Sequence, residues 1–325
     1  MGSHQSKPDA QLYNPEKVNY PLHTGSNIKI NVEDPNINFF FFGCWNKNLS
    51  ATELIVRNIE SKKFFFGIII GDNFYPEKLI EPDGVSKKKI FNLENISKGF
   101  EILKIFKNPI YIGLGNHEVD NPKPCATLIE EINQSLGTNL MMPSNYYCLD
   151  ITKKSKIFII DTNLFEINEC YNESVRSMAK KTMLEWLEKN IRENIKNNII
   201  IIGHFPLYYI NKKLKFTINE TMIELYNILI KYPRIKFYYM CADVHNYQHI
   251  EHENIIEIIS GTGGADLDNI PNIENEEYII DDKKFKVLYS LKEYGYVDIN
   301  ITNSDEIIHK FKYIPLFFGG YYNKN

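Results

Sequence analysis

Side chains that bind metals follow four largely apolar runs of the sequence, each close to the point where the run ends. The runs are residues 64–70, 108–114, 198–202 and 234–240. The side chains that follow them are Asp72, Asn116, His204, Asp243 and His245. Continuous apolar runs are typical of strands buried on both faces, and open α/β sheets hold their ligands at the carboxyl ends of such strands. Because paired strands lie about 5 Å apart, we expect these oxygen and imidazole donors to converge on one site suited to Fe, Mn or Zn.

The same residues lie in four motifs that occur in a defined order along the chain. The motifs are Gly71-Asp72-Asn73-Phe74-Tyr75, Gly115-Asn116-His117-Glu118, Gly203-His204-Phe205-Pro206 and Ala242-Asp243-Val244-His245. Together they resemble the calcineurin-like metallophosphoesterases and, within that superfamily, the small purple (tartrate-resistant) acid phosphatases. The resemblance extends from about residue 39 to about residue 264. It implies an α/β fold, a four-layer α/β/β/α sandwich of two mixed sheets flanked by helices, with the site at the carboxyl ends of the strands.

The resemblance also implies a centre of two metal ions and gives its ligands distinct roles. Asp72 matches the aspartate that bridges the two ions. Tyr75 and His245 match ligands of the first ion, whereas Asn116 and His204 match ligands of the second. The resemblance therefore predicts that two half-sites share one carboxylate.

His117 matches the histidine that donates a proton to the leaving alcohol in the family. In the two-metal mechanism the ions lower the pKa of a bound water, and the resulting hydroxide attacks phosphorus in line. A histidine beside the leaving oxygen then acts as a general acid. The resemblance thus predicts His117 as the catalytic residue.

Two positions depart from the pattern of the family. Cys44 stands where the family has an aspartate after its first strand, and Asp243 stands where it has a histidine. A thiolate binds Zn or Fe when the metal lowers its pKa, but its donor atom is one atom closer to the backbone than that of aspartate. These changes leave three states open, in which two metal ions, one or none are retained.

Three functions are compatible with this altered site. The first is hydrolysis of phosphomonoesters, with a phosphorylated small molecule or protein as substrate. The second is that of a catalytically impaired pseudophosphatase, a scaffold that binds a protein partner, sometimes at a membrane. The third is binding of phosphate-bearing ligands with one remaining metal ion. Of these, we favour the phosphoesterase with altered ligands.

Composition and the N-terminus bear on partners and location. The chain of 325 residues has a formal net charge of −4, so no basic excess points to nucleic acid, and its five cysteines form no disulfide framework. Without a signal-like apolar segment or a stretch of roughly 18 apolar residues, we expect an intracellular protein. Gly2 fits the pattern for N-myristoylation, which would give peripheral membrane association.

The domain organisation that we expect is simple. Residues 1–35 are polar and contain four prolines, which favours a flexible lead-in, and residues 36–325 form one metallophosphoesterase domain. We expect a helix that Ser50 caps, with Glu53 completing the capping box and Leu54 on its apolar face. Further helices are expected over about 95–106, 127–136, 174–197 and 219–231.

Overall fold

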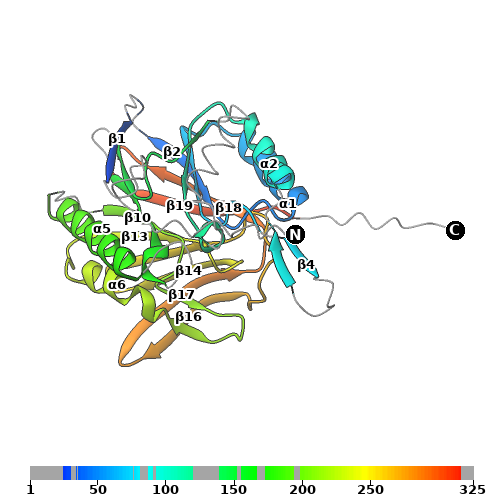
Figure 1. The fold of residues 1–325 in the computed structure, drawn as a ribbon. Helices are drawn as coiled ribbons and strands as arrows, with labels where there is room; N and C mark the ends of the chain where they lie inside the picture. The colour runs from blue at the N-terminus through cyan, green and yellow to red at the C-terminus, as the bar shows by residue number, and fades with distance from the viewer. Residues whose placement is uncertain are drawn as a thin grey trace, which may run out of the picture.

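The structure is a computed structural model, and the parts of the chain that it describes hold two β-sheets with helices on their outer faces (Figure 1). The described residues are 25–30, 34, 36–75, 77–80, 87–90, 93–119, 139–151, 155–166, 173–193 and 198–315. The expected helix over 127–136 and the acceptor Gly2 lie outside them. No helix within these ranges combines the length and the apolar character needed to cross a bilayer.

The larger sheet is mixed and has nine strands. In spatial order they are β1 (Ser26–Ile30), β8 (Tyr147–Ile151), β9 (Lys156–Ile159), β10 (Asn198–Ile202), β13 (Lys236–Cys241), β15 (Ile255–Ser260), β14 (Tyr247–His252), β17 (Lys283–Leu291) and β16 (Ile273–Ile280). Strands β9, β10, β13 and β15 run parallel, whereas β15, β14, β17 and β16 pair antiparallel. The parallel centre therefore brings the ends of β10 and β13 to the same edge of the sheet.

The smaller sheet is also mixed and has six strands. Their order is β19 (Ile307–Tyr313), β18 (Gly295–Ile301), β2 (Ile37–Phe42), β3 (Phe66–Ile70), β6 (Ile110–Gly113) and β7 (Leu140–Met141). Strands β2, β3, β6 and β7 are parallel, and β18 pairs antiparallel with both β2 and β19. Two hairpins stand apart from the sheets, β4 (Glu77–Ile80) with β5 (Lys87–Ile90) and β11 (Tyr208–Ile210) with β12 (Phe216–Ile218).

Helices cover the outer face of each sheet (Figure 1). On the smaller sheet they are α1 (Leu49–Glu60) and α2 (Leu93–Ile102), and on the larger sheet α5 (Glu173–Glu193) and α6 (Ile223–Ile230). The short helix α3 (Asn116–Val119) follows β6, and single 3-10 turns cover Leu103–Ile105, Thr162–Phe165 and Glu220–Met222. The expected helices over 95–106 and 219–231 are thus each divided between an α-helix and a 3-10 turn.

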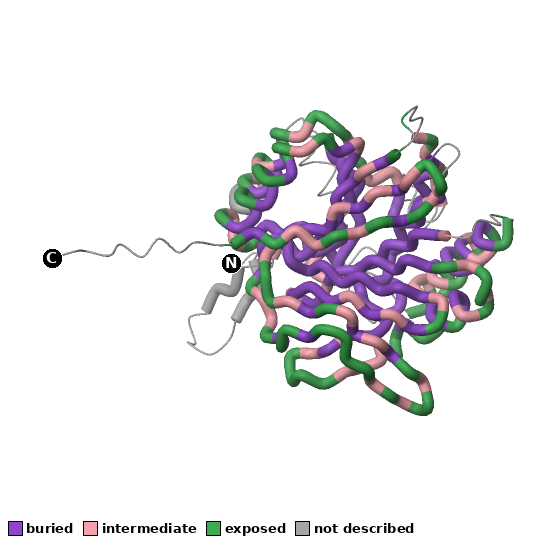
Figure 2. The backbone as a smooth tube through the Cα atoms, turned by 180° about the vertical axis from the view of Figure 1, so that it is seen from behind, coloured by how far each residue is buried: buried purple, intermediate pink, exposed green. Residues whose placement is uncertain are grey.

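Three apolar layers hold the four layers of secondary structure together. Along β2, Phe39 and Phe41 enter the core between the sheets, whereas Phe40 and Phe42 enter the core beneath the helices of the smaller sheet. Strand β10 divides its isoleucines in the same way between the central core and the core beneath α5 and α6. In Figure 2 the buried segments lie together in the interior of the molecule, with the exposed segments around them. Burial on both faces explains the unbroken apolar runs, and the four-layer α/β/β/α sandwich is confirmed.

Strand β1 lies within the segment that we expected to be a flexible lead-in. It pairs in parallel with β8 at the edge of the larger sheet. Its alternate residues Ile28 and Ile30 pack against the core between the two sheets, while the intervening side chains are exposed. This alternation of apolar and polar residues is typical of a half-buried strand, which is why the fold begins before residue 36.

Helix α1 differs from its expected start and apolar face. Its N-cap is Asn48, whose side chain accepts a hydrogen bond from the backbone N–H of Ala51, so Ser50 lies inside the helix. Glu53 pairs with Arg57 one turn later rather than closing a capping box. Leu54 is 43% exposed, while the neighbouring Ile55 is fully buried.

Replacing Asn48 with alanine should lower the free energy of unfolding by about 1 kcal/mol, because the first turn of α1 loses its side-chain cap. Urea denaturation of the purified protein measures this change. The variant Ser50→Ala is the control and should have nearly wild-type stability. A larger loss in Ser50→Ala than in Asn48→Ala would contradict the position of the cap.

Candidate metal centre

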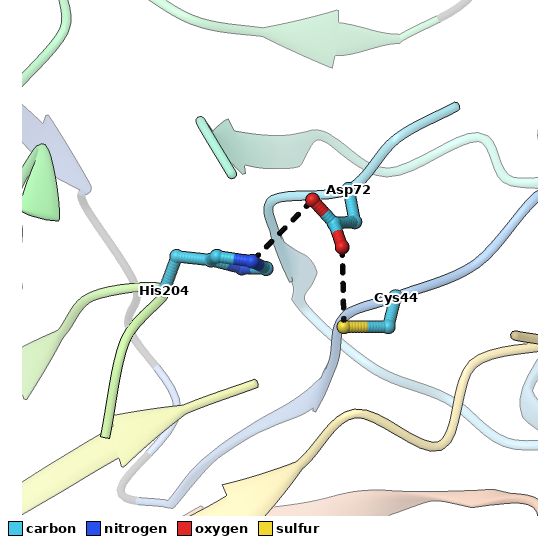
Figure 3. A group of neighbouring side chains, drawn as sticks. All are labelled: Cys44, Asp72 and His204. Carbon is cyan, nitrogen blue, oxygen red and sulfur yellow. Dashed lines mark hydrogen bonds and ion pairs between the residues drawn. The ribbon is translucent and has the colours of Figure 1, made fainter. Parts of the chain in front are cut away.

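The predicted ligands come together at one edge of the two facing sheets. Cys44 follows β2, Asp72 follows β3 and His204 follows β10. Figure 3 shows the thiol of Cys44 and the imidazole of His204 against opposite oxygens of the Asp72 carboxylate. One donor atom from each of these three residues lies within 4.8 Å of the other two, and all three are buried. The three donors therefore meet across the facing ends of two sheets rather than along paired strands of one sheet, because β2 and β3 belong to the smaller sheet and β10 belongs to the larger one.

The Asp72 carboxylate is at the centre of this arrangement. Its Oδ1 lies 3.4 Å from His204 Nε2 and accepts a hydrogen bond of 3.1 Å from the backbone N–H of His117. Its Oδ2 accepts a hydrogen bond of 3.2 Å from the Tyr75 hydroxyl and lies 3.8 Å from Cys44 Sγ. Each oxygen thus faces a different set of donors, as a bridging carboxylate requires.

On the Oδ1 side, His204 gathers the remaining predicted donors. His204 Nε2 lies 3.1 Å from Asn116 Oδ1 and 3.8 Å from Asp243 Oδ1. His204 Nδ1 lies 3.1 Å from the carbonyl oxygen of Ile70. A bond from Nδ1–H to that carbonyl turns Nε2 towards the carboxylates and the amide.

On the Oδ2 side, His245 has the same kind of arrangement. Its Nδ1 lies 2.9 Å from the carbonyl oxygen of Asp266, and its Nε2 lies 3.3 Å from the Tyr75 hydroxyl. Its backbone N–H donates to Asp268 Oδ2 at 3.1 Å. Metal-binding histidines typically donate their second ring N–H to a carbonyl or carboxylate in this manner.

His117 lies beside the centre rather than within it. Its ring packs against that of Tyr75, with 4.6 Å between the centroids, and its Nε2 lies 3.9 Å from Asp72 Oδ2. About a quarter of its side chain is exposed, in contrast to the buried His204. His117 is therefore placed to contact both the centre and a ligand that approaches from solvent.

The buried ionisable groups of the centre shift one another's pKa values. Burial alone would raise the pKa of Asp72, but the positive charge and hydrogen bond of His204 outweigh it and lower the value to about 2. Burial would lower the pKa of His204, but the charge of Asp72 outweighs it and raises the value to about 9. Burial raises the pKa of Asp243 to about 6, against the opposing effect of His204. An anionic Asp72 thus faces a cationic His204 in the metal-free protein.

Cys44 and Tyr75 hold their protons strongly in the same state. Burial, followed by the negative charge of Asp72, raises the pKa of the Cys44 thiol well above its usual value. Burial, followed by the charge of Cys44, does the same for the pKa of the Tyr75 hydroxyl. Both groups would have to lose a proton to solvent in order to bind a metal ion as anions.

Glu118 is a supporting residue that the sequence analysis missed. Its fully buried carboxylate accepts hydrogen bonds from the backbone N–H groups of Asp72, Asn73 and Gly115. Burial, followed by the charge of Asp72, raises its pKa to about 8. Glu118 belongs to the Gly-Asn-His-Glu motif, but nothing in the spacing indicates that its side chain returns to the turn after β3. It fixes the backbone that carries the central carboxylate.

Close packing of the backbone also shapes the centre. A Cβ atom on Gly115 would lie 2.3 Å from the backbone nitrogen of Asp72, so only glycine fits there. Cys44, Asp72 and Asp243 all adopt positive φ angles of 50–58°. This conformation is uncommon for residues with a side chain, and Asp adopts it more readily than most.

The donors present fit a pair of metal ions that share Asp72. One set comprises Asn116, His204 and Asp243, and the other comprises Cys44, Tyr75 and His245. Oxygen and imidazole donors suit Fe, Mn and Zn, and the thiol adds a ligand that favours Zn or Fe. The fixed orientation of both imidazoles supports this fit. The set with Cys44 and Tyr75 holds two protons that a metal ion would have to displace.

A sandwich of two mixed sheets with such a cluster at the strand ends defines a phosphoesterase-type α/β protein. The family model of the calcineurin-like phosphoesterases, a superfamily of dinuclear metal-dependent enzymes, matches residues 37–247, and the chain belongs to this family.

Curated relatives and solved structures agree with this assignment. The chain is 22% identical to tartrate-resistant acid phosphatase type 5 of Oryctolagus cuniculus over 251 residues, which are 70% of this chain and 73% of that protein. It is 23% identical to the Homo sapiens protein of the same name over 251 residues, again 70% of this chain and 73% of that protein.

The purple acid phosphatase PPD1 of yellow lupin (Lupinus luteus) aligns with a TM-score of 0.59 at 16% identity, covering 86% of this chain and 52% of that one. GAP50, "the anchor in the inner membrane complex of Plasmodium", aligns with a TM-score of 0.58 at 16% identity, covering 86% and 85%. At these identities the two structures show the shared fold.

Proposed function

We propose that the chain hydrolyses phosphomonoesters at a dinuclear metal centre altered at Cys44 and Asp243. The observation that carries the proposal is the orientation of the two imidazoles. His204 and His245 each direct Nδ1 to a backbone carbonyl and Nε2 to the donors around Asp72. Metal ions bound there would activate water and neutralise phosphoryl oxygens. Phosphorylated small molecules and phosphoproteins are both substrates that such a site accommodates.

The residues of the chain have separate tasks in this reaction. Asp72 holds the two half-sites together, and Asn116 with His204 and Tyr75 with His245 complete them. His117 Nε2, on the exposed side of Asp72, carries the proton that the leaving oxygen needs. The hydrogen bond from the His117 backbone to Asp72 keeps this imidazole beside the reacting group.

Hydrolysis of an aryl phosphate by the purified protein, across pH and with Fe, Mn or Zn added, tests this proposal. We expect turnover in the wild type and a loss of about 10²- to 10⁴-fold in His117→Ala, because the leaving group then departs without a general acid. Phosphate release and metal content are measured on the same samples. Equal rates in the wild type and His117→Ala under every condition would overturn the proposal.

A second candidate function is that of a catalytically impaired scaffold. The proton that Cys44 retains favours it, because a neutral thiol weakens one half of the centre. The shared fold with GAP50, which is described as an anchor, is consistent with it. In this case myristoylation of Gly2 would bring the chain to a membrane, where it would bind a protein partner. Metal content separates the candidates: two ions per chain support the enzyme, and none supports the scaffold.

A third candidate, which Cys44 also favours, is a binder of phosphate-bearing ligands that retains one metal ion. The half-site with Asn116, His204 and Asp243 contains no such protonated thiol and would hold this ion. One ion per chain, with phosphate binding but no turnover, would support this candidate.

A further inference from the structure

A carboxyl group lies in the apolar core between the larger sheet and its helices. Glu257 is in the middle of β15 and is fully buried. Its neighbours in register are Tyr239 of β13 and Ile250 of β14, which both belong to this core. Burial raises the pKa of Glu257 to about 8. A carboxyl group in such surroundings is costly unless its oxygens accept hydrogen bonds.

The partners of Glu257 all come from the strand-end region that carries the metal centre. Its Oε1 accepts a hydrogen bond of 2.6 Å from the backbone N–H of Leu207, and its Oε2 accepts one of 3.1 Å from that of Tyr208. The thiol of Cys241 lies 3.5 Å from Oε1. Leu207 and Tyr208 follow His204 by three and four residues, so the carboxylate holds the segment that leads away from this histidine.

Other side chains of the same core hold the segment at His204 itself. The Thr162 hydroxyl accepts hydrogen bonds from the backbone N–H groups of His204 and Phe205, at 3.0 and 3.1 Å. The Tyr239 hydroxyl donates a bond of 2.6 Å to the carbonyl oxygen of Phe205. The five residues from His204 to Tyr208 include Pro206 and, until β11 begins at Tyr208, no helix or strand. Hydrogen bonds from side chains therefore fix the backbone of this segment, as backbone–backbone hydrogen bonds do in helices and sheets.

The backbone of residues 204–208 has to be placed precisely because its first residue, His204, belongs to the metal centre. The His204 imidazole is fully buried, and its Nε2 must face Asp72 and Asn116 while Nδ1 meets the Ile70 carbonyl. A metal ligand has to be held within about 0.5 Å of its working position. A shift of the backbone at Phe205 or Leu207 would move the imidazole directly.

We infer that Glu257, together with Tyr239, is a positioning residue that sets the His204 imidazole for metal binding. The inference rests on the proposed metal centre and adds residues that do not touch it. An apolar side chain at this position would leave the buried N–H groups of Leu207 and Tyr208 without their acceptor, so the carboxyl group is what fixes the backbone of this segment. The two oxygens of the Glu257 carboxyl group match the two successive N–H groups of Leu207 and Tyr208, in the segment that follows Pro206.

Two variants and one matched control test this inference. Glu257→Gln keeps the shape but offers an NH₂ group to one of the two N–H donors, and Tyr239→Phe removes only the bond to Phe205. The control is Tyr226→Phe, which makes the same chemical change in the same core but removes a bond to His252 of β14. If Glu257→Gln fails to fold, Tyr239→Phe and its control still decide the question.

Titration with Mn²⁺ and Zn²⁺ gives the first measurement. We expect Glu257→Gln and Tyr239→Phe to bind the ions about 10- to 100-fold more weakly than the wild type, as is typical of residues that orient metal ligands. Tyr226→Phe should bind with wild-type affinity despite a similar loss of thermal stability. Wild-type affinity in both test variants, or equal weakening in the control, would overturn the inference.

The ring nitrogen signals of His204 in the metal-free protein give a measurement that requires neither metal nor turnover. NMR spectra should show the same His204 ring-nitrogen signals in the wild type and in Tyr226→Phe, with shifted or mixed signals in Glu257→Gln and Tyr239→Phe, because a displaced imidazole changes the hydrogen bond between Nδ1 and the Ile70 carbonyl. A chain that binds no metal would refute the proposed metal centre, yet these signals would still report on the positioning of His204. Unchanged signals in both test variants would refute the positioning role on its own.

Discussion

Metal binding should be almost abolished when Asp72 is replaced by asparagine. The Asp72 side chain contacts donors of both half-sites, with His204 on Oδ1 and Tyr75 on Oδ2. An asparagine keeps the volume but removes the charge and turns one oxygen into an NH₂ group. Since residues that only orient ligands change metal affinity by about 10- to 100-fold, loss of the shared ligand should exceed 100-fold.

In the metal-free protein, Asp72→Asn should also lower the pKa of His204 and the free energy of unfolding. His204 is buried and owes its raised pKa first to the charge of Asp72, which opposes the effect of burial. Without that charge the pKa of His204 should fall, and the buried pair that is lost should cost about 3–5 kcal/mol of the free energy of unfolding. Isothermal titration with Zn²⁺ and Mn²⁺ measures affinity, and urea denaturation measures stability.

The control for this prediction is Asp298→Asn, an identical chemical change on β18. Asp298 is paired at 3.9 Å with the partly exposed Lys62 and contacts no donor of the centre. Such pairs contribute about 0–1 kcal/mol, so neither metal affinity nor stability should change much. If Asp72→Asn bound metal as tightly as Asp298→Asn, the two half-sites would not share Asp72.

The architecture was predictable because its signals are strong and local. Runs such as residues 66–70 and 199–202 contain no polar side chain and are buried throughout, as expected of strands covered on both faces. Parallel neighbours of one sheet end at the same edge, which places Cys44 beside Asp72 in the smaller sheet. His204 meets them only because the larger sheet packs against the smaller one. The resemblance to the phosphoesterases added the second sheet and the layers of helices.

Details that depend on contacts between distant segments were not predictable. Asn48 and Ser50 are equally good caps by residue type, and the bond from the Asn48 backbone to the Gly264 carbonyl, at 2.8 Å, fixes the start of α1. The side chain of Glu118 could equally have faced solvent, since only the fold brings three N–H groups to it. Glu257 resembles an ordinary polar residue of a strand until the His204 segment is placed above it.

Metal binding should become stronger when the ligands of the family are restored. The double variant Cys44→Asp with Asp243→His tests this prediction. Both positions have positive φ angles, 53° and 58°, and Asp and His are among the residues that tolerate this conformation. The backbone therefore already suits the restored side chains. A carboxylate at position 44 would replace a thiol whose pKa burial raises, so a metal ion would no longer have to displace that proton.

The metal-free double variant should be less stable than the wild type. Cys44 Sγ lies 3.8 Å from Asp72 Oδ2, so a carboxylate there would bring two negative charges together in a buried site. A metal ion relieves this repulsion, and a ligand that binds only the folded state stabilises it by about 2.7 kcal/mol at 100 times its Kd. The rise in melting temperature on adding metal should thus be larger in the double variant than in the wild type.

Metal content and the rate of aryl phosphate hydrolysis show how far Cys44 and Asp243 weaken the centre of the wild type. We expect the double variant to hold more metal per chain and to turn over at least about 10-fold faster, because a firmly held pair of ions supports the attack on phosphorus. Cys44→Ser, which removes the thiol without adding a carboxylate, should show neither gain. Two metal ions per chain in both the wild type and the double variant would mean that Cys44 and Asp243 are full ligands. The altered centre would then be a working variant of the family's site rather than an impaired one.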